Sequence, residues 1–176
     1  MKPAVFQRLI SPTWRPGRAA IAGLLATLVY SLVMYGDMHL TGQRFNDVRF
    51  IEGLLEGQSV PQKRVPLLAW SLHLLNGVLL AEVYAAIGKR FLPGPNWVKG
   101  SLFGALFTLA LWGTTPLIDN THPMIQSGYL PRLASRSLLA QNLARHLLFG
   151  LTLGLLYQDQ DPDPALSAKL SAKETP

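Results

Sequence analysis

The sequence predicts an all-α membrane protein, a four-transmembrane-helix bundle made of two similar helical hairpins. Two observations support this. Of the 176 residues 49% are hydrophobic and only 15% are charged, and the charges gather in patches separated by long apolar stretches. Four of these stretches have about the 20 residues needed to cross a bilayer core of about 30 Å. Each must be helical, because lipid offers an open backbone no hydrogen-bond partner.

The predicted spans cover residues 18–36, 67–87, 98–118 and 138–157. Residues 1–17 form an N-terminal segment, and the polar, Pro-broken residues 158–176 form a disordered tail. In the first outer loop, apolar residues recur at helical spacing from Phe45 to Leu55. This pattern predicts a short amphipathic helix on the outer leaflet or capping the bundle. The second outer loop, 119–137, is expected to open with a turn and to be otherwise irregular.

Lysine and arginine counts predict the orientation. Nine cations flank one side of the spans and six flank the other. The short basic turn between spans two and three, 88–97, is the strongest indication of orientation, because it holds no acid. Cytoplasmic loops carry such an excess. We therefore expect both termini in the cytoplasm of a bacterial cell, and the protein in its inner membrane. The nine are Lys2, Arg8, Arg15, Arg18, Lys89, Arg90, Lys99, Lys169 and Lys173, and the six are Arg44, Arg49, Lys63, Arg64, Arg132 and Arg136.

The amino-acid composition also excludes some classes of function. The net charge is +6, but no basic stripe with interleaved aromatic residues points to nucleic acid. The chain has no cysteine, which excludes disulfides, thiolate metal sites and thiol redox chemistry. The partners that remain are the lipid bilayer and other membrane subunits, including further copies of the chain.

An internal repeat links the two hairpins. His73, Gly77 and Tyr84 in the second span recur as His146, Gly150 and Tyr157 in the fourth, at identical spacing. A weaker match pairs Arg18, Gly23 and Thr27 with Lys99, Gly104 and Thr108. Because the order of spans is kept, we expect the hairpins to superpose by a rotation of about 180° about the membrane normal. The small and polar residues should face the bundle interior.

The order of these features resembles the YagU-type inner-membrane proteins of bacteria. The features that carry the resemblance are Gly23, His73 to Tyr84, Gly100 with Gly104, Pro116 and His146. The resemblance covers most of residues 18–157 and implies a four-helix inner-membrane fold. It implies no activity and transfers no functional residue.

The histidines are the candidate cofactor ligands. His73 and His146 at matched depth could ligate one haem iron from both faces, with Arg145 pairing with a propionate. The alternative is that each histidine hydrogen-bonds a neighbouring helix as part of the packing. We expect no cofactor, and we expect Gly77 to contact Gly150 directly, which would leave no room for a haem. No carboxylate or thiol at ligand spacing supports a metal site.

Three other polar residues fall within predicted spans. Arg145 is expected to reach outward and pair with Asp37 or Asp119, or else to bind a lipid headgroup or quinone. Glu82 is expected to pair with Lys99 or Arg18, or else to carry a proton. Asn76 is expected to donate a hydrogen bond to another helix.

These features leave three hypotheses for function. The first is a non-enzymatic accessory or self-associating subunit, because glycine-rich helix faces suggest helix partners beyond the chain. The second is a b-type haem electron-transfer subunit that uses His73 and His146. The third, which has less support, is a small transporter, since only Pro116 could break a span.

Overall fold

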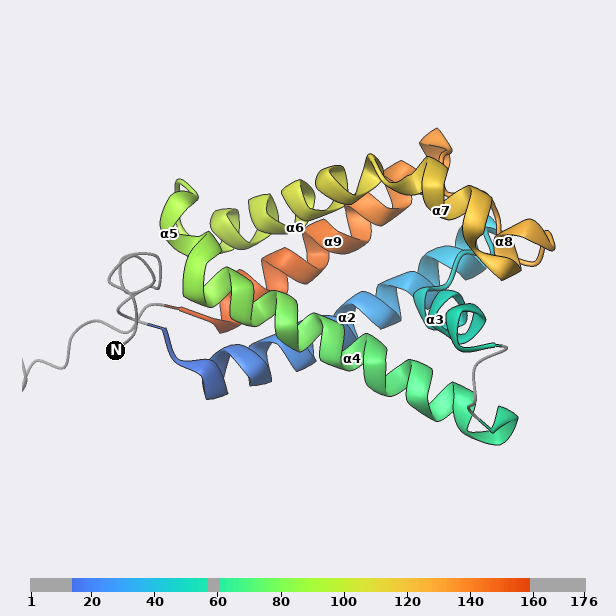
Figure 1. Cartoon of the computed structure of the whole chain (residues 1–176). Helices are drawn as coiled ribbons and strands as arrows, with labels where there is room; N and C mark the ends of the chain where they lie inside the picture. Colours follow the sequence, from blue (N-terminus) through green and yellow to red (C-terminus); the bar gives the residue numbers. More distant parts are fainter. Residues whose placement is uncertain (1–13, 57–60, 159–176) are drawn as a thin grey trace, which may run out of the picture.

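The computed structural model describes residues 14–56 and 61–158, and these residues are helical with short connections (Figure 1). The predicted disordered tail beyond residue 158 and residues 1–13 of the predicted N-terminal segment lie outside the described residues. The elements are α2 (Pro16–Thr41), α3 (Asp47–Leu55), η1 (Gln62–Arg64), α4 (Val65–Val83), η2 (Tyr84–Gly88), α5 (Lys89–Phe91), α6 (Asn96–Trp112), α7 (Thr115–Thr121), α8 (Pro123–Gln126) and α9 (Arg136–Leu156).

Four long helices form two antiparallel pairs, α2 with α4 and α6 with α9, and α2 packs against α9 to join them. The described chain begins and ends at one end of the molecule, where α5 also lies, whereas α3, α7 and α8 gather at the other end (Figure 1). This arrangement agrees with the hairpin order expected from the sequence.

Glycine lets α6 and α9 approach to backbone contact. A Cβ added to Gly100 would overlap the carbonyl oxygen of Gly150, and one added to Gly104 would overlap that of His146. A Cβ on Gly154 would likewise meet the carbonyl of Asn96. Small residues at such spacing let helices pack closely where lipid provides no hydrophobic driving force.

The α2–α4 pair uses the same chemistry at a different register. A Cβ on Gly77 would overlap the hydroxyl of Thr27, and one on Gly23 would lie 2.5 Å from the Cβ of Ala81. The interior of this pair consists mainly of alanines, with Ala19, Ala26 and Ala81 fully buried. Close packing here therefore depends on the absence of large side chains.

Two expectations about the glycines are wrong. Gly77 and Gly150 do not meet each other, because each contacts the first helix of its own hairpin, at Thr27 and Gly100 respectively. The sequence match paired Thr27 with Thr108, but Thr27 corresponds in packing to Gly100, about two helical turns earlier. The first helices of the two hairpins therefore do not repeat in the register that the sequence suggested.

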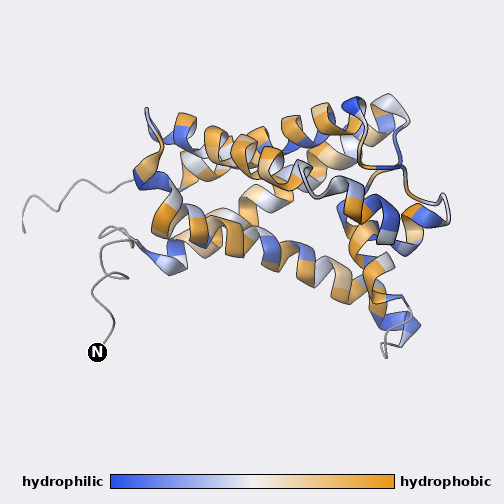
Figure 2. Ribbon diagram, turned by 45° about the horizontal axis from the view of Figure 1, so that its top comes forward, coloured by the Kyte–Doolittle hydropathy of each residue, from blue (hydrophilic) through white to orange (hydrophobic). Residues whose placement is uncertain are grey.

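Large apolar side chains face outward. Ile21, Leu32 and Leu67 expose 63%, 73% and 72% of their surface, and the hydrophobic colouring covers the outer faces of the long helices (Figure 2). Small residues inside and large apolar residues outside are the pattern of a helix bundle in lipid. Apolar patches of this extent are rare on soluble monomers.

Two helices are long and apolar enough to cross a membrane, namely Pro16–Thr41 and the continuous helical run Gln62–Phe91. A third span is reached if α6 and α7 are counted together across a 56° bend. The third predicted span, 98–118, is thus not one straight helix. It breaks after Trp112, and the hydroxyl of Thr115 donates to the carbonyl of Trp112 at 2.8 Å where regular hydrogen bonding stops.

The predicted amphipathic helix is present as α3. Asn46 caps it by accepting hydrogen bonds from the amides of Val48 at 2.9 Å and Arg49 at 3.2 Å, which satisfies amides that have no partner within the helix. α3 packs on α4 and α8, so it caps the bundle. The second outer loop is more ordered than expected, because it contains α7 and α8.

Candidate functional site

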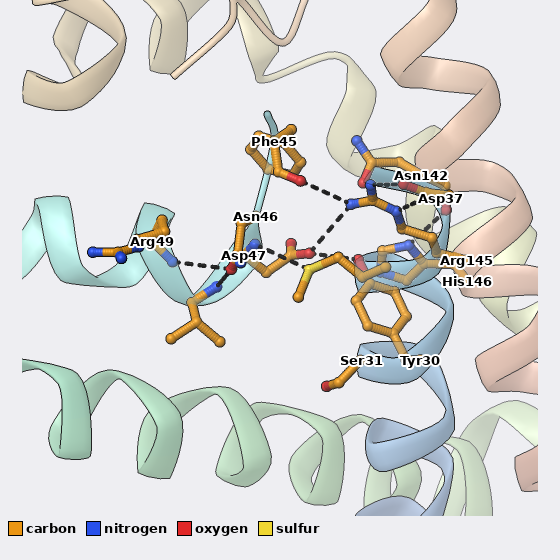
Figure 3. Close-up of polar contacts among 12 residues, drawn as sticks. Tyr30, Ser31, Asp37, Phe45, Asn46, Asp47, Arg49, Asn142, Arg145 and His146 are labelled. Carbon is orange, nitrogen blue, oxygen red and sulfur yellow. Dashed lines mark hydrogen bonds and ion pairs between the residues drawn. The ribbon is translucent and has the colours of Figure 1, made fainter. Parts of the chain in front are cut away.

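The site is built around Arg145, whose side chain is fully buried. Its Nε and Nη2 donate to the two carboxylate oxygens of Asp37, both at 2.6 Å. Its Nη1 donates to the carbonyl of Phe45 at 3.4 Å and lies 3.8 Å from Asp47 Oδ2. Figure 3 shows the guanidinium of α9 between Asp37 of α2 and the chain that enters α3. A buried charge is tolerated only when it is paired in this way.

Asp47 is the second acid of this cluster. It is the first residue of α3, where the positive end of the helix dipole favours a carboxylate. The hydroxyl of Tyr30, a buried residue of α2, donates to its Oδ2 at 2.8 Å. The cluster therefore holds two carboxylates, Asp37 and Asp47, against the single guanidinium of Arg145, and carries one surplus negative charge while both acids are ionised.

Both histidines contact Tyr30. The ring centroid of His73 lies 5.9 Å from that of Tyr30, and the ring of His146 meets it edge-on at 5.0 Å. His73 comes from α4 and His146 from α9, so Tyr30 of the central helix α2 connects the two hairpins. The histidine pair predicted from the repeat is thus brought to one place, though not face to face.

Hydrogen bonds fix the tautomer of each histidine when it is neutral. The single hydroxyl proton of Ser31 goes to the carbonyl of Thr27, so the Ser31 oxygen accepts from Nε2–H of His73 at 3.0 Å. Nδ1–H of His146 donates to the carbonyl of Asn142 at 2.9 Å. Among the described residues, none hydrogen-bonds the remaining nitrogen of either ring. Each neutral imidazole therefore keeps one acceptor nitrogen available.

Two cavities adjoin the cluster, and Asp47 and His146 line both. The smaller, of about 40 Å³, lies between α2, α4 and α9 and is also lined by Tyr30, His73 and Asn76. That volume and its polar lining suit a few water molecules. The larger, of about 170 Å³, lies between α3, the α6–α7 bend and α9. We call them the polar cavity and the apolar cavity.

The arrangement does not fit a haem. Tyr30 occupies the space beside both imidazoles, so the two rings do not face each other across an open gap. The polar cavity of about 40 Å³ is far below the roughly 300 Å³ at which pockets for larger ligands begin. Each guanidinium nitrogen of the fully buried Arg145 already donates to Asp37 or to the carbonyl of Phe45, so the group is not open to a propionate.

The other predicted site residues have mixed outcomes. Pairing of Arg145 with Asp37 is confirmed, but Asp119 instead accepts from the amides of Leu133 and Ala134 at 2.6 and 3.0 Å. The side chain of Arg145 is fully buried, so its guanidinium is not accessible to a lipid headgroup or quinone.

Glu82 and Asn76 differ from expectation. Glu82 accepts a hydrogen bond from Nε1 of Trp14 at 2.8 Å rather than pairing with Lys99 or Arg18. Asn76 makes no interhelical hydrogen bond within the described chain, and its side chain borders the polar cavity. In the same described part, no three His, Asp or Glu residues converge to hold a metal ion.

Tyr30, Ser31 and Asp47 were not among the site residues predicted from the sequence. A signal was present, because Tyr30-Ser31 interrupts the otherwise apolar run of the first span. Asp47 gave no comparable signal, since acids are expected in the first turn of any capped helix.

Comparison with known proteins assigns a family. A model for a family of unknown function, DUF6789, matches residues 15–167. The chain belongs to the DUF6789 family. The match covers every element of the site described above, from α2 to α9, and nothing in it links this DUF6789 chain to the YagU-type proteins that it resembles in feature order. No curated protein and no solved structure matched the chain.

Proposed function

We propose that the chain is a four-span bacterial inner-membrane protein, with both termini in the cytoplasm, that binds a proton at Asp47 and carries it across the membrane. The cation bias of its loops supports the orientation. The length of α9, 21 residues or about 31 Å, supports a fourth span. Arg136 is the first residue of that helix, and its other charged residue, Arg145, is buried and paired rather than exposed to lipid.

The observation that carries this proposal is the position of Asp47 and His146 between two cavities. Asp47 can take a proton, and the open Nε2 of the neutral His146 can accept one. Their neighbours that titrate or carry charge are Tyr30 and Asp37 from α2, His73 from α4, and Arg145 from α9. An acid that is not fully neutralised and that borders a polar cavity at the end of a membrane helix bundle is a candidate proton carrier.

Two features favour a carrier over an open channel. Below the polar cavity, α2 and α4 are in contact through Gly23, Gly77 and Ala81, so protons have no open route along this pair. The third span is broken between α6 and α7 with a 56° bend. Broken helices at a binding site are a recurring feature of secondary transporters.

The structure gives less support to the accessory-subunit hypothesis. The glycines that suggested partners beyond the chain are occupied within it, as Gly100 with Gly150 and Gly77 with Thr27 show. Self-association would have to use other faces of the bundle.

The test is proton flux into liposomes that contain the purified protein and a trapped pH-sensitive dye. A potassium gradient with valinomycin supplies the driving potential. We expect the wild type to acidify vesicles well above protein-free liposomes, and Asp47→Asn to lose at least nine-tenths of that rate. Glu52→Gln is the matched control, because Glu52 is a buried acid of α3 that pairs with Arg49 and borders neither cavity. Equal rates for wild type and Asp47→Asn would overturn the proposal.

A further inference from the structure

The apolar cavity adjoins the Asp47 cluster, and the α6–α7 bend forms one of its walls. Phe45, Phe50, Trp112, Leu111 and Ile118 supply its apolar lining. Its volume of about 170 Å³ is close to that of an engineered 150 Å³ cavity known to bind benzene. A single six-membered ring with a short substituent therefore fits by size.

Several polar groups of this cavity can only accept a hydrogen bond from a ligand, although the lining also includes Asn142 and Trp112, which carry donors. The hydroxyl protons of Thr108, Thr114 and Thr115 are spent on backbone carbonyls, at 3.0, 2.7 and 2.8 Å. His146 donates through Nδ1 to its own helix, which leaves Nε2 as an acceptor when the ring is neutral. A ligand with hydrogen-bond donors is therefore matched to the acceptors of Asp47 and His146 in this lining.

The charges around Asp47 further restrict the class of ligand. Asp47 and Asp37 share the single guanidinium of Arg145, whose two shortest contacts go to Asp37. The neighbouring cation Arg49 is bound to Glu52 at 2.9 Å. The cluster thus favours an incoming positive charge at Asp47, and the aromatic walls favour a cation beside them through cation–π attraction.

We propose that the apolar cavity binds a small lipophilic ammonium ion, with its ring among Phe45, Phe50 and Trp112 and its N–H donors directed at Asp47 and His146. This proposal names the class of solute that binds at Asp47. Its physiological meaning rests on the proposed function. When Asp47 carries a proton, binding of the ammonium releases that proton to water, and departure of the ammonium reverses the exchange.

The test is calorimetric titration of the full chain in lipid nanodiscs with three probes of one shape. Benzylammonium is the cation, benzyl alcohol the neutral donor and benzoate the anion. We expect benzylammonium to bind at least tenfold more tightly than benzyl alcohol, and benzoate not to bind. Asp47→Asn should abolish the preference for the cation while benzyl alcohol binds as before, which also shows that the cavity survives the substitution. Glu52→Gln should keep the preference.

A preference for the alcohol or the anion, equal binding of cation and alcohol to the wild type, or a cation preference that survives Asp47→Asn would overturn the inference. So would benzylammonium binding that Thr115→Leu, which adds bulk to the cavity wall, leaves unchanged. Specific amine binding without proton flux would overturn only the proposed proton carriage. Proton flux without amine binding would overturn only this inference.

Discussion

Gly150 and Gly36 allow one substitution to be compared at two helical positions of the same chain. A Cβ on Gly150 would overlap the carbonyl oxygen of Gly100 and lie 3.2 Å from the Cα of Ser101. Both obstacles are backbone atoms of α6, so no side-chain rotation relieves them. A Cβ on Gly36 in α2 meets nothing within 4 Å. Gly150→Ala should therefore push α6 and α9 apart, and Gly36→Ala should not disturb the packing.

The expected magnitudes differ in sign. Overpacking a close contact costs about 1–3 kcal/mol, and replacing a helical glycine by alanine returns up to about 1 kcal/mol. Gly150→Ala should therefore lower the free energy of unfolding by about 1–2 kcal/mol. Gly36→Ala should raise it by up to about 1 kcal/mol. The two variants should therefore differ by about 1–3 kcal/mol, which is about a 5- to 150-fold difference between their unfolding constants.

The assay is reversible unfolding in mixed micelles, with sodium dodecyl sulfate as denaturant and far-ultraviolet circular dichroism as the signal. The two variants should move the transition midpoint in opposite directions from the wild type. If both alanines shift it equally, or if Gly150→Ala is the more stable protein, then α6 and α9 are not in backbone contact through this glycine.

Three further predictions concern the ion pair, the orientation and the cofactor. Asp37→Asn should lower the free energy of unfolding by about 3–5 kcal/mol, because it leaves the buried Arg145 charge short of a partner. The double variant Asp37→Asn, Arg145→Met should lose less stability in the same detergent titration. Equal losses in the single and double variants would contradict a stabilising pair. Single cysteines at Asn120 and Pro93 should react with an impermeant thiol reagent from opposite sides of a sealed vesicle, and reaction of both from one side would disprove the topology. The purified protein should show no Soret band in its visible spectrum, and a band that disappears in His73→Ala would restore the haem hypothesis.

Much of the helical architecture can be predicted from sequence because hydropathy and helix capping are local properties. The apolar runs marked the long helices, and the spacing from Phe45 to Leu55 marked α3. Pairing of Arg145 with Asp37 was also predictable, since a charge within a span needs a partner and few acids lie at the right depth.

The break in the third helix and the helix-to-helix register were not predictable in this way. The run 98–118 is mostly apolar on both sides of Trp112, and hydropathy does not register the 56° bend there. The repeat placed His73 and His146 correctly near each other but suggested contact between Gly77 and Gly150. Each glycine instead packs within its own hairpin, because a helix with small residues can slide by whole turns and still present a small face.

By itself the sequence determined the long apolar helices and the short helix α3, and it marked Arg145 as a charge that needs a partner. Only the tertiary structure decided that Tyr30 lies against both histidines and that Asp47 joins Arg145 between two cavities. The physical reason is that Tyr30, Asp47 and Arg145 are far apart in the chain and on three different helices. Their meeting depends on how closely the glycines allow those helices to approach, which is a property of packed pairs and not of any single segment.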